Sequence, residues 1–165
     1  MKIKTLCLAD QSFQKSFPDY KLFIREIISY INVHLKNSNT SLSATIKSWD
    51  TKNIKKTYKD HLKNMFKNTK KYDLVIGFTN KKIFWDHPLW CGINYEKNIM
   101  IGNFFPIKIP FLYRYGLKKL TLHELGHFLG LNDSFFIKFS IMDNFFGIFA
   151  SRFTKKQLAT IRKVK

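Results

Sequence analysis

The sequence predicts a single α+β domain whose N-terminal part alternates strands and helices as α/β proteins do. Three observations predict this class: a long amphipathic helix pattern at 19–36, a buried strand pattern at 73–78, and two short strand patterns at 92–95 and 98–101. The chain has 165 residues, of which 45% are hydrophobic, enough for one core of ordinary size. No repeat or linker marks a second domain, so we expect residues 1–165 to form one.

The first half of the chain supplies the alternating elements. Residues 3–9 form an apolar run typical of a strand, and residues 41–49 alternate apolar and polar side chains as a strand does. Pro18 opens the helix predicted at 19–36, whose apolar side chains recur on one side at Phe23, Ile27, Tyr30, Ile31 and Leu35. Residues 57–68 also carry apolar side chains at helical spacing, which predicts a second helix.

The segments after residue 80 are harder to assign. Residues 81–90 are irregular and aromatic, and the strand patterns at 92–95 and 98–101 are separated by a turn-like pair. The aromatic segment 104–115 contains two prolines and could line a cleft, touch a membrane surface or cover the core, and core cover is the interpretation we favour. A helix is predicted from about 115–117 to 129.

A last helix is predicted at 154–164, with Thr154 as its N-cap. Seven phenylalanines bracket residue 142, and we expect most of them to be core. One or two could form the wall of a pocket for large apolar side chains. The seven are Phe135, Phe136, Phe139, Phe145, Phe146, Phe149 and Phe153.

The motif that carries chemistry is HELGHFLGLND, residues 123–133. Residues four apart lie on the same face of a helix, so His123 and His127 can direct ring nitrogens at one metal ion. Glu124 lies about 100° further round the helix, near the metal without being needed as a ligand. It is therefore free to take a proton from water at the metal, which is the reason for an H-E-x-x-H motif.

Two further features add a third ligand. The chain must reverse after His127 before position 133 can reach the same ion, and Gly130 supplies the reversal because glycine adopts the left-handed C-cap conformation without steric cost. Asp133 then closes a three-ligand site whose fourth position is open for water. Downstream, residues 140–143 (Ser-Ile-Met-Asp) predict a tight turn that contains Met142.

Residues 123–133 followed by Met142 resemble the signature of the metzincin zinc peptidases, H-E-x-x-H-x-x-G-x-x-H/D with a methionine-containing Met-turn. The aspartate at 133 resembles the branch with an aspartate ligand, as in snapalysin-like enzymes, and departs from the commoner histidine. The chain also has no tyrosine between Met142 and the C-terminus, so a transition-state donor from that region is absent.

The resemblance implies a role for each matching residue. It implies that one catalytic Zn²⁺ is bound by His123, His127 and Asp133. It further implies that Glu124 is the general base and acid, and that Met142 forms a hydrophobic floor under the metal.

The resemblance also implies an architecture: a twisted mixed sheet with an antiparallel edge strand, two N-terminal helices, the zinc-binding helix, the Met-turn and a C-terminal helix. Residues 1–130 would form an N-terminal subdomain and residues 131–165 a C-terminal one. In such enzymes an extended peptide adds to the edge strand beside the cleft. The candidates by chain order are Gly92, Ile93, Asn94 and Tyr95, unless these residues form an ordinary edge strand that meets water.

The motif and the resemblance together predict a zinc-dependent endopeptidase whose polypeptide substrate lies extended in the cleft. Because Asp133 lowers the charge of the metal site from +2 to +1, we expect a weaker Lewis acid and an activity maximum at or above neutral pH. One alternative is a zinc-stabilised module without catalysis that binds an acidic protein or nucleic acid. Another is a zinc hydrolase that acts on a small amide.

The chain is strongly basic, with 29 Lys and Arg against 11 Asp and Glu and a net charge of +18. Such a charge favours binding to nucleic acid, anionic membranes or acidic substrates. The scattered lysines and the abundance of Lys, Asn, Ile and Phe favour instead a compositional origin, which is the interpretation we prefer.

The cysteines and the remaining histidines predict no second site. Cys7 and Cys91 are too few for a disulfide framework, and we expect Cys7 to pack as a small hydrophobic residue rather than act as an inhibitory latch on the metal. His34, His61 and His87 are expected at the surface or in hydrogen bonds. No run approaches a transmembrane span and no signal peptide is evident, so we expect a monomer that is cytoplasmic or exported by a non-classical route.

Overall fold

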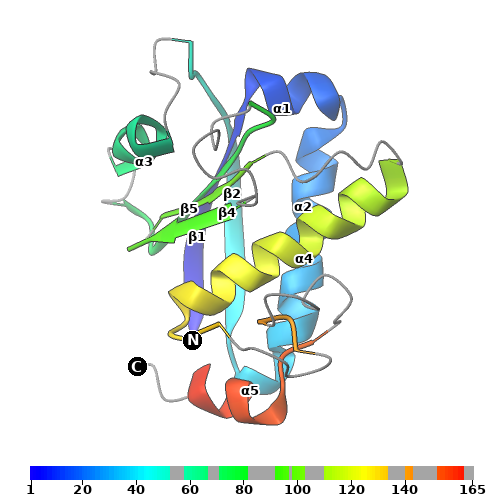
Figure 1. Ribbon diagram of the computed structural model, residues 1–165, viewed down its shortest axis with the longest axis vertical. Coiled ribbons are helices and arrows are strands. Elements are labelled where there is room, and N and C mark those ends of the chain that lie inside the picture. Colours follow the sequence, from blue (N-terminus) through cyan, green and yellow to red (C-terminus); the bar gives the residue numbers. More distant parts are fainter. Residues whose placement is uncertain are drawn as a thin grey trace.

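The computed structural model describes residues 1–52, 58–66, 71–81, 92–96, 98–102, 110–133, 140–142 and 152–161. A five-stranded sheet with the order β2-β1-β3-β5-β4 lies at its centre (Figure 1). Neighbours among the first four strands are parallel, and β4 is antiparallel to β5 at the edge, which confirms the predicted mixed sheet. The strands are β1 (Lys2–Asp10), β2 (Ser41–Trp49), β3 (Leu74–Phe78), β4 (Gly92–Tyr95) and β5 (Asn98–Ile101).

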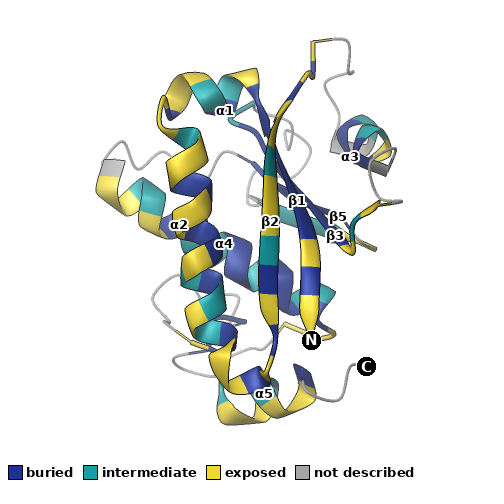
Figure 2. Cartoon of the chain, turned by 180° about the vertical axis from the view of Figure 1, so that it is seen from behind, coloured by how far each residue is buried: buried dark blue, intermediate teal, exposed yellow. Residues whose placement is uncertain are grey.

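Helices cover both faces of the sheet. Helices α2 and α4 lie across one face and α3 lies on the other (Figure 1 and Figure 2). The long helix predicted at 19–36 is confirmed one residue shorter at each end, and the helix predicted at 57–68 is confirmed over the described residues 58–66. The helices are α1 (Gln11–Ser16), α2 (Tyr20–Leu35), the 3-10 turn η1 (Lys36–Ser38), α3 (Tyr58–Phe66), α4 (Pro110–Phe128) and α5 (Lys155–Ile161).

Side-chain alternation along the strands divides the core into two clusters. In β1, Cys7 and Ala9 pack with α2 and α4, whereas Leu6 and Leu8 face α3. Cys7 is fully buried, and burial raises the pKa of its thiol to about 12. It therefore packs as the small hydrophobic residue expected from the sequence, and its thiol is poorly placed to act as a latch.

A buried carboxylate ties together the carboxyl ends of three parallel strands. Asp10, at the end of β1, accepts hydrogen bonds from the Phe13 amide (2.8 Å) and the Ser12 hydroxyl (2.6 Å), which caps α1. Its other oxygen accepts from Thr79 after β3 (2.7 Å) and Thr51 after β2 (3.3 Å). The short helix α1, which the sequence pattern did not predict, depends on this cap.

Helix α4 spans Pro110–Phe128, so the chain is already helical five to seven residues before the predicted start at 115–117. Its first turns project beyond α2 (Figure 1). Phe111 is 76% exposed, and Leu112 and Tyr115 are also exposed, so the prediction that this segment covers the core is wrong for these residues. Tyr113 instead points inward and donates a hydrogen bond to Asn80 (2.9 Å). Residues 104–109 lie outside the described residues.

Two ion pairs fix α4 against α2. The Arg114 guanidinium contacts Asp19 at 2.5 Å, and the Lys118 ammonium contacts Glu26 at 3.0 Å. The Arg114 guanidinium also lies 4.6 Å from the ring centroid of Phe23, which is fully buried. These contacts join the N-terminal half of α4 to α2.

The last helix starts as predicted. The Thr154 hydroxyl accepts from the Gln157 amide (3.2 Å) and the Gln157 side chain accepts from the Thr154 amide (2.8 Å), which is a capping box. Phe153 is buried in the core, while the other six phenylalanines named above lie outside the described residues. Within the described ranges, no helix is long and apolar enough to cross a membrane.

Candidate metal centre

The chain reverses after α4 at the glycine that the motif supplies. Gly130 has a φ of 81°. The Leu131 amide donates to the Gly126 carbonyl and the Gly130 amide donates to the His127 carbonyl, both at 2.9 Å. These two bonds form a Schellman motif with glycine at its left-handed position, as the sequence predicted. The reversal brings Asp133 back toward the helix.

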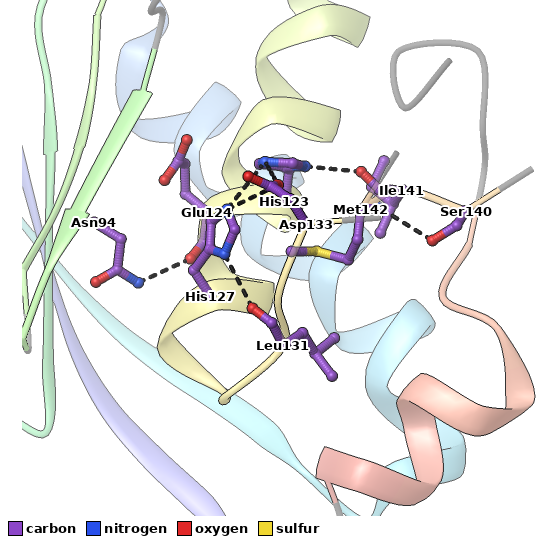
Figure 3. A network of polar contacts seen from close by, with 9 residues as sticks. All are labelled: Asn94, His123, Glu124, His127, Leu131, Asp133, Ser140, Ile141 and Met142. Carbon is purple, nitrogen blue, oxygen red and sulfur yellow. Dashed lines mark hydrogen bonds and ion pairs between the residues drawn. The ribbon is translucent and has the colours of Figure 1, made fainter. Parts of the chain in front are cut away.

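Three candidate ligand atoms converge beside the last turns of α4 (Figure 3). Nε2 of His123 lies 3.2 Å from Nε2 of His127, and Oδ1 of Asp133 lies 3.4 Å and 3.3 Å from them. Ligand atoms about 2.0–2.1 Å from a tetrahedral zinc lie about 3.3 Å from one another. The triangle therefore has the dimensions of one face of a zinc coordination tetrahedron.

Backbone carbonyls orient both imidazole rings. Nδ1 of His123 is 2.9 Å from the Ile141 carbonyl oxygen, and Nδ1 of His127 is 3.0 Å from that of Leu131. A carbonyl can only accept, so each Nδ1 carries the proton and each Nε2 presents its lone pair to the ion position. Both rings are thus held in the tautomer that binds metal.

The electrostatic setting keeps His123 neutral. Burial lowers the pKa of His123, and the neighbouring His127 lowers it further, against opposing effects of the Ile141 hydrogen bond and of Asp133. The contact between His123 and Asp133 is therefore a contact between ligand atoms rather than an ion pair. A neutral imidazole is the form that binds a metal ion.

Glu124 lies beside this triangle without belonging to it. Its side chain is only 7% exposed and points toward β4 (Figure 3). Burial, and to a lesser extent the charge of Asp133, raises the pKa of Glu124 to about 8. A carboxyl group with a raised pKa next to a metal position is suited to exchange protons near neutral pH.

The edge strand β4 runs alongside Glu124. Gly92 packs against the Glu124 side chain, and the Asn94 side-chain amide donates to the Glu124 carbonyl at 3.1 Å. Ile93 points to the opposite face of the sheet, and Tyr95 is exposed. The structure thus places the predicted strand beside the site with two of its four residues facing α4. Their substrate-binding role stays a prediction.

Met142 packs under the end of α4. It is fully buried, and its sulfur would lie 2.3 Å from a Cβ added at Gly126. The Ser140 hydroxyl accepts from the Met142 amide (3.1 Å) and donates to the Gln157 side chain (3.0 Å), which anchors this segment to the last helix. The spacing of the motif did not single out Gly126, although a glycine there allows the methionine to approach.

Among the described residues, neither His34 nor His61 belongs to the cluster of candidate ligands. His34 contacts the Tyr30 carbonyl (2.7 Å), in agreement with the sequence prediction. His61 is fully buried and packs edge-on against Trp49, so a surface position for it is wrong. His87 lies outside the described residues. Sequence reasoning also missed the carbonyls of Leu131 and Ile141, because any residue type can supply one.

The arrangement of the whole chain is similar to that of archaemetzincin from Methanopyrus kandleri, with a TM-score of 0.70, 17% identity, and coverage of 98% of this chain and 95% of that chain. The chain has an archaemetzincin-like fold. A chain in a structure of a chaperone–substrate complex is also similar, with a TM-score of 0.62, 13% identity, and coverage of 98% of this chain and 33% of that one. No protein-family model and no curated protein matches the sequence. The archaemetzincin-like fold confirms the predicted fold class.

Proposed function

We propose that this protein is a zinc-dependent endopeptidase. The observation that carries the proposal is the triangle of His123, His127 and Asp133, whose ligand atoms are 3.2–3.4 Å apart. These distances, the fixed tautomers and the neutral imidazole all suit a zinc ion with one open coordination position. The archaemetzincin-like fold supports the same proposal.

Within this proposal, each residue has a distinct task. The two histidines and Asp133 would hold the ion, which supplies Lewis-acid chemistry and makes water more acidic. Glu124 takes the proton from the attacking water and returns it to the leaving amine. Its buried position beside β4 limits competing bulk water around the carboxylate.

The edge strand supports a polypeptide substrate over a small amide. β4 pairs with β5 on one side only within the described residues, and Glu124 lies next to it. An extended peptide can add to such an edge through main-chain hydrogen bonds, which aligns one of its peptide bonds with the site. A small amide would gain nothing from the strand.

The first test is the zinc content of the purified protein and of Asp133→Ala, measured by inductively coupled plasma mass spectrometry. We expect about one zinc per chain in the parent and a clear loss in the variant, because two histidines alone bind zinc weakly. Parent protein that takes up no zinc when zinc is supplied would overturn the proposal.

The second test separates an enzyme from a zinc-stabilised module that binds an acidic partner. Glu124→Ala should lose peptidase activity by roughly 100-fold or more, the usual contribution of general acid–base catalysis, and keep its zinc. The readout is cleavage of a mixed library of unstructured peptides. Equal activity in parent and variant would rule out the assigned base.

A further inference from the structure

The first residue of β4 leaves room for the side chain of the proposed base. A Cβ added at Gly92 would lie 2.7 Å from Oε1, 2.8 Å from Cγ and 2.9 Å from Cδ of Glu124. Real Cβ atoms essentially never approach other atoms within 3.0 Å. The Glu124 side chain thus occupies the space that any larger residue at 92 would need. Because that side chain is flexible, the larger residue would displace the carboxylate rather than the helix.

Asn94 holds the strand at this distance from the helix. Residues two apart on a strand point to the same face, so Asn94 and Gly92 both face α4. The Asn94 side-chain amide donates to the Glu124 carbonyl at 3.1 Å. The strand cannot withdraw to make room at position 92 without breaking this bond. The two residues therefore act on the same glutamate, one on its side chain and one on its main chain.

We infer that Gly92 and Asn94 are positioning residues that set where the Glu124 carboxylate lies. The inference rests on the proposed function, since the position of the carboxylate matters most if it transfers a proton. A misplacement of about 1 Å in a catalytic group can cost roughly 100-fold in rate. The close approach of Gly92 and the Asn94 hydrogen bond keep that position fixed while leaving the three metal ligands untouched.

The first experiment compares kcat, KM and zinc content of Gly92→Ala with those of the parent. We expect kcat to fall by about 10- to 100-fold with little change in zinc content, because only the carboxylate moves. Gly77→Ala in β3 is the matched control: an added Cβ there would lie 2.8 Å from the Met65 sulfur, on the sheet face covered by α3. It should lower stability and leave kcat unchanged. Full kcat in Gly92→Ala would overturn the inference.

Asn94→Ala tests the second of the two positioning residues. It should lower kcat at unchanged zinc content, because the strand is no longer fixed to the carbonyl of Glu124. Adding Gly92→Ala to this variant should lower kcat by a smaller factor than it does in the parent, because a strand that is free to withdraw can accommodate the methyl group. Parental kcat in Asn94→Ala, or fully additive losses in the double variant, would contradict the coupled role.

A double-mutant cycle on stability tests the contact without using activity. Urea unfolding at fixed free zinc would be measured for the parent, Gly92→Ala, Glu124→Ala and the double variant. We expect Gly92→Ala to destabilise the parent and to have no such effect once Glu124 is truncated. Equal effects in both backgrounds would overturn the inference, even in an active enzyme. A zinc-loaded parent that cleaves no peptide would instead overturn the proposed function and leave Gly92 a packing residue only.

Discussion

The sheet core and the metal centre are held by different forces. Around β1, β3 and α2, apolar side chains alternate into two clusters, and burial supplies the stabilisation. At the end of α4, the two histidine rings are fixed by hydrogen bonds to the carbonyls of Leu131 and Ile141. Gly92 and Gly126 allow the side chains of Glu124 and Met142 to approach the main chain closely. The comparison teaches where changes should act: substitutions in the core should mainly lower stability. Substitutions at the centre should alter metal binding and catalysis and, where they change a buried group, stability as well.

The strongest test of this difference is Phe23→Ala in α2. Phe23 is fully buried among the rings of Phe13 and Phe17, so its removal should lower the free energy of unfolding by about 3–5 kcal/mol. Zinc content and kcat of the remaining folded protein should not change. Leu22→Ala, at a residue that is 58% exposed on the same helix, is the control and should alter stability little in urea unfolding. A loss of zinc in folded Phe23→Ala would show that the two regions are coupled.

A second test uses pH on the metal-free protein. Burial raises the pKa of Glu124 from 4.5 to about 8, so the folded state favours the protonated form. The protonated Glu124 carboxyl group therefore makes its full contribution to stability below pH 4.5, its pKa in the unfolded chain. This contribution is lost as the pH rises toward about 8, its pKa in the folded chain. Glu124→Gln cannot ionise and should be more stable than the parent at pH 8 in EDTA, by up to about 4 kcal/mol.

The same comparison at pH 4 should show no difference, because the carboxyl group is then protonated in both the folded and the unfolded state. Glu26→Gln serves as the control on a half-exposed glutamate of α2. Parallel stability curves for parent and Glu124→Gln between pH 4 and pH 8 would show that Glu124 is solvated like a surface residue.

Gly126→Ala should have an intermediate effect on both stability and metal binding. The added methyl group would lie 2.3 Å from the Met142 sulfur and 3.2 Å from the Phe153 ring, and such overpacking costs about 1–3 kcal/mol. Displacing Met142 also moves the neighbouring Ile141 carbonyl that orients His123, so zinc affinity should fall. Thermal unfolding and a competitive zinc titration measure the two effects. In a Met142→Ala background, Gly126→Ala should lower the free energy of unfolding and the zinc affinity much less, because the methionine side chain is no longer there to be displaced.

The smallest expected effect is at the ion pair between Arg114 of α4 and Asp19, next to the start of α2. The Arg114 guanidinium lowers the pKa of Asp19, so the stabilisation is present above the unfolded pKa of Asp19 and is lost as pH falls through its lower folded pKa. Because both side chains are substantially exposed, Asp19→Asn should cost at most about 1 kcal/mol at pH 7. The cost should shrink at pH 2 and at high salt, in urea titrations.

The regularity of the core is why its elements could be predicted from sequence. Strand β2 matches its predicted bounds, and α2 differs by one residue at each end, since alternation and helical periodicity directly reflect burial. The sequence pattern did not predict helix α1, because its six residues are too few to show a helical repeat of apolar side chains and the helix depends on the Asp10 cap. The start of α4 was missed because exposed aromatic residues there carry no amphipathic pattern.

The residues of the metal centre could be predicted from the sequence only where their spacing along the chain fixes their relative positions. His123, Glu124 and His127 follow from helical spacing, and Gly130 from the need for a reversal after the helix. The contact of Gly92 with Glu124 joins residues 32 positions apart, and the role of the Ile141 carbonyl depends on a fold that brings residue 141 under the helix. Such contacts leave no periodic pattern in a single sequence.

The carbonyl groups that accept hydrogen bonds from the two imidazoles link metal binding to the mobility of the main chain outside the site. Leu131 lies just after α4, whereas Ile141 lies eighteen residues from His123 and also donates its amide to the Arg152 carbonyl. An ion that immobilises the rings therefore also restrains two separate stretches of main chain, one of them joined to the last helix. Amide hydrogen exchange at the described residues of these stretches, 131–133 and 140–142, should slow as the site fills, so these two stretches report metal occupancy.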